Sequence, residues 1–238
     1  FEAVPLAGDA LVAFATVSIV AGSVLAVIQS DVKRMLAYSS VAQFGMIVAA
    51  FGLATEQALV GGIVHLVGHG LMKTALFLGV GVIASAYGVR TVRQYANLGY
   101  RSPVAVAAIA ALLLGLVGVP PSIGFLGKWY IAWGAIEAGA PIVAAVVLFS
   151  TLLTLLYVAR LLETMYFQPA DDIEGAVTAD GSGVRLLSDG GSGDDGDERP
   201  VSFGMVFVVA ALSVAAVALG FAGPVFEAFL DPFLEAVL

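Results

Sequence analysis

Two of the three lysines and both histidines of this sequence lie in long apolar stretches. His65, His69 and Lys73 follow one another at intervals of four residues, so an α-helix places them on one face, about one turn apart. Neutral imidazole both donates and accepts hydrogen bonds, and burial in an apolar medium disfavours the charged form of an amine. Together with Lys128 in a second apolar stretch, these residues predict a path for protons.

Other chemistries fit these residues less well. Histidines four apart can share a zinc ion, but the zincin motif has a Glu after the first His, where this sequence has Leu66, and no third ligand is evident. One face of one helix cannot supply both axial ligands of a haem. No Ser or Asp stands in register with the histidines as a nucleophile, and the chain has no cysteine for thiolate or iron–sulfur sites. We therefore expect no catalytic site, no cofactor and no metal; enzyme activity would arise only as a translocase within a redox complex.

The elements that carry these residues must lie in a membrane. The chain is 60% hydrophobic and 12% charged, with a mean hydropathy of +1.01, whereas soluble domains carry about 25% charged residues. Windows of ~20 apolar residues, enough to cross the hydrocarbon core, recur along it. The predicted spans are 10–29, 35–54, 58–86, 141–165 and 201–222, together with an interrupted stretch at 103–139. The third span is longer than a bilayer needs, which predicts a tilt or a break near its Gly-flanked histidines.

Pro120 and Pro121 interrupt the stretch 103–139, because consecutive prolines cannot continue a helix. Each half has about 16 residues, too few for a span. If the stretch is one broken crossing, one side of the membrane holds Lys33, Arg34, Arg90, Arg93, Arg101, Arg160, Arg185 and Arg199. The positive-inside rule favours that count. It predicts an all-α bundle of about six crossings in the plasma membrane, with both chain ends outside.

Three regions follow from this reading: a transmembrane repeat at 1–167, an acidic cytoplasmic loop at 168–200, and a final span with an amphipathic tail at 201–238. The formal net charge is −8, and much of it lies in the loop. Asp31 and Lys33 stand at a helix start near the predicted cytoplasmic surface, where an anchor and topology signal is favoured over a gate. The chain opens on Phe1 without an initiator Met, which we interpret as a segment of a longer protein.

Three motifs in order resemble the antiporter-like subunits of respiratory complex I and of Mrp-type Na⁺/H⁺ antiporters. They are 31–40 (DVKRMLAYSS), 65–73 (HLVGHGLMK) and 118–130 (GVPPSIGFLGKWY). The resemblance covers about residues 10–167, and the ending 127–130 looks closest to the Mrp D-type subunit. It implies the second of two inverted five-helix repeats, followed by the final helices.

By this resemblance His65, His69 and Lys73 match the family's midplane relay, and Lys128 matches the broken-helix lysine that leads to the outer exit. The first repeat, with its Glu–Lys pair, is absent. We therefore expect partners in the bilayer, including whatever supplies that repeat, with protons and possibly Na⁺ as transported ions and no nucleic acid. The predicted function is the proton-translocating subunit of an Mrp-type antiporter. The alternatives are a complex I-type pumping subunit and a structural scaffold whose lysines pair with a partner's carboxylates.

Overall fold

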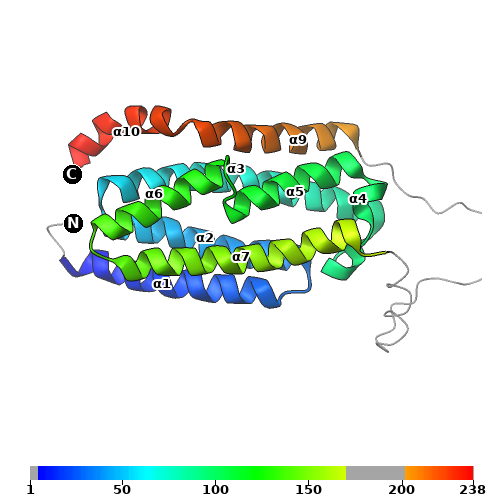
Figure 1. The fold of residues 1–238 in the computed structure, drawn as a ribbon, viewed down its shortest axis with the longest axis horizontal. Helices are drawn as coiled ribbons and strands as arrows, with labels where there is room; N and C mark the ends of the chain where they lie inside the picture. Colours follow the sequence, from blue (N-terminus) through cyan, green and yellow to red (C-terminus); the bar gives the residue numbers. More distant parts are fainter. Residues whose placement is uncertain (1–4, 170–201, 238) are drawn as a thin grey trace, which may run out of the picture.

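The computed structural model describes residues 5–169 and 202–237, and within them it contains helices and no β-strand. Five helices are long and apolar enough to cross a membrane. They are α1 (Pro5–Ile28), α2 (Val32–Leu53), α3 (Glu56–Tyr87), α7 (Pro141–Phe167) and α9 (Phe203–Ala218), the last extended by a short turn. The helices run roughly parallel or antiparallel along the long axis (Figure 1). The chain is an all-α, multi-pass membrane protein, as the composition predicts.

The predicted interruption at the two prolines is confirmed. Helix α5 (Pro103–Val117) ends at Gly118, whose backbone is left-handed (φ 95°), and α6 (Ile123–Glu137) begins after the Pro120–Pro121 pair, whose peptide bond is cis. The two helices follow one another in the same direction beside α3 (Figure 1). They therefore form one broken crossing, which brings the total among the described residues to six.

The sequence predicts a tilt or a break in the third span; the break is wrong, and the tilt stays a prediction. Helix α3 is continuous over 32 residues, although a hydrocarbon core needs only ~20. Gly68, beside His69, serves packing instead. A side-chain carbon added at Gly68 would lie 2.8 Å from the Ile123 side chain, so the absence of a side chain there lets the start of α6 approach α3 closely.

Glycines also bring the remainder of α6 against α3. A Cβ atom at Gly61 would lie 2.6 Å from the Ile131 backbone nitrogen, and one at Gly127 would lie 2.7 Å from the His65 Cβ. A Cβ at Gly134 would overlap the Ala58 backbone. Small residues that let two backbones touch are a common means of helix association in membranes, where apolar side chains gain little by leaving lipid. This close crossing brings Lys128, the residue after Gly127, to the histidine face of α3.

The two ends of the bundle differ in their covering. At one end lie a short 3-10 helix (Val92–Tyr95) and α4 (Leu98–Arg101); at the other lie both described chain termini (Figure 1). The tail forms α10 (Gly223–Val237), which buries Leu230 and Leu234, and Glu227 of this helix accepts a 2.5 Å hydrogen bond from the Tyr130 hydroxyl. The predicted acidic loop, apart from residues 168 and 169, lies outside the described residues.

The glycine crossing can be tested by adding one methyl group. Gly134→Ala should lower the free energy of unfolding by about 1–3 kcal/mol, because the α6 backbone must move away from Ala58. The matched control is Gly70→Ala on α3, where an added Cβ meets no atom within 4 Å; it should leave stability unchanged or raise it by up to ~1 kcal/mol. Thermal unfolding in detergent measures both. Equal effects of the two substitutions would contradict the close α3–α6 crossing.

Candidate functional site

The polar face of α3 lies inside the bundle. His65, His69 and Lys73 are 1%, 2% and 6% exposed, as buried as the apolar core around them. The two imidazole rings are stacked, with their centroids 6.1 Å apart, and Phe44 meets the His69 ring edge-on at 5.6 Å. The four-residue spacing thus produces the single row of side chains that the sequence predicts.

Helix α2 supplies hydrogen-bond partners to this row. The Lys73 ammonium donates to the Ser39 hydroxyl at 2.5 Å and to the Leu36 carbonyl at 2.6 Å, and His65 Nε2 is hydrogen-bonded to the Gln43 amide oxygen at 2.8 Å. Because α2 and α3 are antiparallel, the earlier residue of α2 meets the later residue of α3. Sequence reasoning missed Ser39 and Gln43; their signal was a pair of polar residues four apart within an apolar span.

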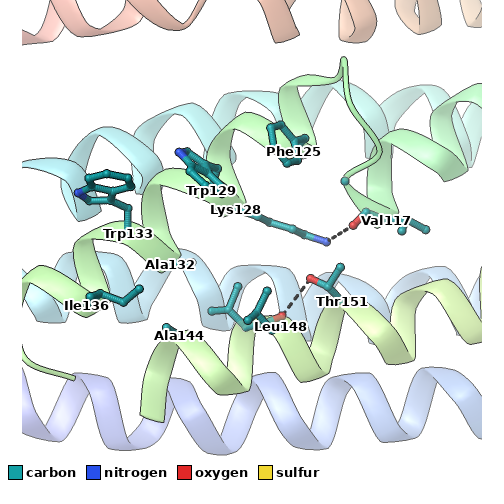
Figure 2. Close-up of a pocket in the computed structure, with 12 residues that line it drawn as sticks. Val117, Phe125, Lys128, Trp129, Ala132, Trp133, Ile136, Ala144, Leu148 and Thr151 are labelled. Atoms are coloured by element: carbon teal, nitrogen blue, oxygen red, sulfur yellow. Dashed lines mark hydrogen bonds between the residues drawn. The ribbon is translucent and has the colours of Figure 1, made fainter. Parts of the chain in front are cut away.

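Lys128 lies at the break between α5 and α6. Its ammonium donates to the carbonyls of Leu116 and Val117, at 2.8 and 2.9 Å, and Figure 2 shows the side chain directed toward Val117. The last carbonyls of a helix have no partner within it and carry the negative end of its dipole, so a cation is well placed there. The proline pair therefore creates the acceptors that hold Lys128 in an apolar environment.

The four buried groups form one series across α3 and α6. The rings of His65 and His69 are stacked one turn apart on α3, and Lys73 lies one turn further along. Gly127 of α6, the residue before Lys128, packs against His65, which gives the order Lys128, His65, His69, Lys73. Within the described residues, neither ring nitrogen of His69 has a hydrogen-bond partner, nor does His65 Nδ1. Buried polar atoms of this kind are usually satisfied by water. Water between them would connect the groups into a hydrogen-bonded chain.

A third helix contributes hydroxyl groups at the Lys73 end. Tyr157 of α7 is buried, and its hydroxyl lies close to those of Ser39 and Thr154 without reaching hydrogen-bonding geometry. Ser39 therefore stands between the Lys73 ammonium and the phenol of another helix. Nothing in the spacing of the sequence associates residues 39 and 157, because the contact depends on how α2 and α7 pack.

A cavity of about 300 Å³ lies beside Lys128, between α6 and α7 (Figure 2). Phe125, Trp129 and Trp133 line one wall, with successive ring centroids 6.0 and 6.1 Å apart. On the opposite wall the Thr151 hydroxyl donates to the Val147 carbonyl at 2.9 Å. Among the described residues that line the cavity none is acidic, so it offers no counter-ion to the lysine.

The other candidate pair, Asp31 and Lys33, lies at the start of α2. The Asp31 carboxylate accepts a 2.9 Å hydrogen bond from the Arg34 backbone nitrogen and so caps α2, while its backbone pairs with that of Thr91. Burial and the nearby Asp31 charge raise the pKa of the Tyr95 hydroxyl. Lys33 is exposed. These contacts fit an anchoring role for Asp31, whereas the gate stays a prediction.

The start of α6, which orients Lys128, depends on a helix cap. The Ser122 hydroxyl accepts a 3.2 Å hydrogen bond from the Phe125 backbone nitrogen. We expect Ser122→Ala to lower the free energy of unfolding by about 1 kcal/mol, because that nitrogen loses its acceptor in an apolar region. Ser202→Ala is the matched control, since Ser202 precedes α9 without a capping side-chain bond. Denaturation of both variants in detergent gives the difference, and a Ser122→Ala variant as stable as the control would refute the cap.

Known proteins share both the sequence pattern and this architecture. Residues 3–154 match the family model described as the NADH:quinone oxidoreductase/Mrp antiporter transmembrane region. NADH-quinone oxidoreductase subunit N of Desulforudis audaxviator is 40% identical over 154 residues, which are 65% of this chain and 31% of that protein. A chain of the Mrp complex from Dietzia superposes with a TM-score of 0.77 at 26% identity, over 98% of this chain and 49% of that one. A chain of respiratory complex I from Thermus thermophilus with bound NADH also gives 0.77, at 25% identity, over 97% and 44%.

All of these matches cover only part of the related protein, and the family match includes the helices of the candidate site. The chain spans about a third of the length of the subunit N relative and about half or less of the two solved chains. The matched residues nevertheless include α1, α2, α3, the broken crossing and the first half of α7. Thus the helices that hold the buried histidines and lysines are those that define the match, and the chain belongs to the NADH:quinone oxidoreductase/Mrp antiporter transmembrane family.

Proposed function

We propose that this chain carries protons through the membrane along Lys73, His69, His65 and Lys128, as part of an antiporter-like membrane subunit. One observation carries the proposal: four buried titratable groups gather where α3 and α6 meet inside a helix bundle, and the two imidazole rings among them are stacked. Ionisable side chains at membrane depth are costly to insert and typically mark ion pathways or proton relays. A purely structural role would not require three ring nitrogens of the series to lack hydrogen-bond partners among the described residues.

The contacts of the two lysines support reversible protonation. Lys73 donates to a carbonyl and a hydroxyl, and Lys128 donates to two carbonyls. All these acceptors are neutral, and no carboxylate pairs with either ammonium within residues 5–169 and 202–237. No ion pair has to break when a proton leaves, and a neutral amine still has N–H groups to donate to the same acceptors. The histidines between them can take a proton at one ring nitrogen and release one from the other.

The path within this chain is one part of a longer one. Because the chain matches only a fraction of each relative's length, we infer that partner subunits or further sequence supply the first repeat expected from the family resemblance. Lys128, at the broken helix, is the proposed exit group, and Lys73, with Ser39 and Tyr157 near it, faces the remainder of the path. A plasma-membrane location, with the termini outside, stays part of this proposal.

The driving reaction separates two candidate assemblies. The residues 127–130 favour an Mrp-type antiporter, in which protons exchange for Na⁺. The similarities do not favour it specifically: the two solved chains superpose equally well, and the 40% identical relative is a subunit of NADH-quinone oxidoreductase. That identity supports redox-driven pumping as the stronger candidate. In both assemblies the buried histidines and lysines of this chain have the same task.

Replacing each buried lysine by a non-titratable donor tests the proposal. We expect Lys73→Gln and Lys128→Gln each to reduce proton transport at least tenfold, because glutamine still donates a hydrogen bond but holds no transferable charge. The assay is proton uptake into vesicles that contain the complex. Arg93→Gln is the matched control, since Arg93 is exposed and outside the series, and it should transport at the wild-type rate.

The same variants separate transport from a scaffold. If the lysines hold partner carboxylates, the substitutions should dissociate the complex, because an unpaired buried charge costs several kcal/mol. We expect an intact complex on native gels in both variants. Wild-type transport in both would end the proton-path proposal, and loss of the complex would favour the scaffold.

Composition of the purified complex identifies the driving reaction. A tag on this chain should recover membrane subunits together with iron–sulfur and quinone-site subunits, identified by mass spectrometry, if redox chemistry drives transport. Recovery of small antiporter subunits without redox partners, together with Na⁺-dependent proton exchange, would instead establish the Mrp-type assembly.

A further inference from the structure

We infer that Gln43 is a positioning residue of the proton path, which fixes the tautomer of His65 so that the ring's Nδ1 is its open, proton-accepting atom. The expected effect on proton transport rests on the proposed function, whereas the tautomer of His65 rests on the contacts among α2, α3 and α6. Gln43 is fully buried on α2, and its amide oxygen lies 2.8 Å from His65 Nε2. It was not among the residues that the sequence singled out.

The hydrogen bond assigns the proton on the ring. A carbonyl oxygen of an amide only accepts, so the partner nitrogen must donate, and His65 carries its proton on Nε2. In neutral imidazole the other nitrogen is then unprotonated. That atom, Nδ1, is buried and has no hydrogen-bond partner among the described residues.

Gly127 of α6 independently favours the same tautomer. A Cβ atom added to Gly127 would lie 2.8 Å from His65 Nδ1, so the hydrogen that glycine carries in that direction points toward this part of the histidine. If the Gln43 amide were rotated by a half-turn, its NH₂ group would donate to His65 Nε2, and the ring proton would have to lie on Nδ1. That N–H would then point at the C–H group of Gly127, which cannot accept a hydrogen bond. Gln43 Nε2 is itself buried without a hydrogen-bond partner among the described residues, so the choice between the two amide orientations rests on the lack of space for an N–H hydrogen beside Gly127.

The open nitrogen therefore lies on the side of the ring toward α6. The residue after Gly127 is Lys128, so the open nitrogen lies on the side of the helix that carries this lysine. Held by Gln43, the ring presents an acceptor toward the broken helix and keeps its donor on α2. A water molecule that links His65 with Lys128 would then donate to Nδ1. Without Gln43, both tautomers become accessible and part of the population presents a donor to α6.

Nitrogen-15 NMR of histidine tests the tautomer directly in the assembled complex. Protonated and unprotonated ring nitrogens have well-separated resonances, and the difference between wild-type and His65→Asn membranes isolates the signals of His65. We expect an unprotonated Nδ1 and a protonated Nε2 in the wild type. Gln43→Leu should produce loss of the single-tautomer spectrum, and Gln43→Glu, which keeps an acceptor at that place, should retain the Nε2 proton. Gln57→Leu, at a glutamine of α3 eight residues before His65, should leave the spectrum unchanged.

Transport of the same variants supplies the second measurement. Gln43→Leu should lower proton transport about 10- to 100-fold, the loss typical when the partner that orients a metal-bound histidine is removed, and Gln43→Glu should restore part of it. A wild-type ring protonated at Nδ1, or an unchanged tautomer in Gln43→Leu, would overturn the inference while leaving the lysine path standing. Wild-type transport in both lysine variants would instead remove the path, whatever the spectrum of His65.

Discussion

The structure depends on how backbone carbonyls are satisfied where α5 stops inside the membrane. An interrupted helix leaves its last carbonyls without donors, and lipid offers none. Lys128 reaches back from the first turns of α6 and donates to Leu116 and Val117. The charge and the break therefore stabilise one another: the lysine satisfies the carbonyls, and the carbonyls give the ammonium an environment that lipid would not provide.

This local arrangement constrains the helices around it. For Lys128 to reach the break and also lie near His65, α6 must touch α3, and the contact is made backbone to backbone at Gly127 and Gly134. Helix α2 contacts the same face of α3 through Ser39 and Gln43. The histidines thus lie where α2, α3 and α6 meet, and three of their ring nitrogens have no hydrogen-bond partner among the described residues. Rigid packing of the backbone and unsatisfied polar atoms occur in the same layer of the bundle, as expected where water rather than protein completes a hydrogen-bonded chain.

Much of this arrangement was predictable from local pattern. The spans follow from runs of apolar residues, the break follows from Pro120 and Pro121, and the single polar face follows from a spacing of four. Features that depend on register between helices were not. Gln43 and Ser39 reach His65 and Lys73 only because α2 and α3 pack antiparallel. Tyr157 comes near Ser39 only because α7 packs on α2. The break expected in α3 is absent from the structure, because a glycine near a histidine is equally compatible with a bend and with a close helix contact. At Gly68 the close approach of Ile123 shows that the glycine serves a helix contact.

The measurement that tests the central claim most directly is an experimental structure of the assembled complex at a resolution that reveals water. The claim is that Lys73, His69, His65 and Lys128 form one connected path. We predict ordered water at the His69 ring nitrogens and at His65 Nδ1, so that side chains and water form a continuous hydrogen-bonded chain from Lys73 to Lys128. Apolar side chains of a partner packed against His69, with no water on either nitrogen, would contradict the claim, because protons would then have no route between the lysines.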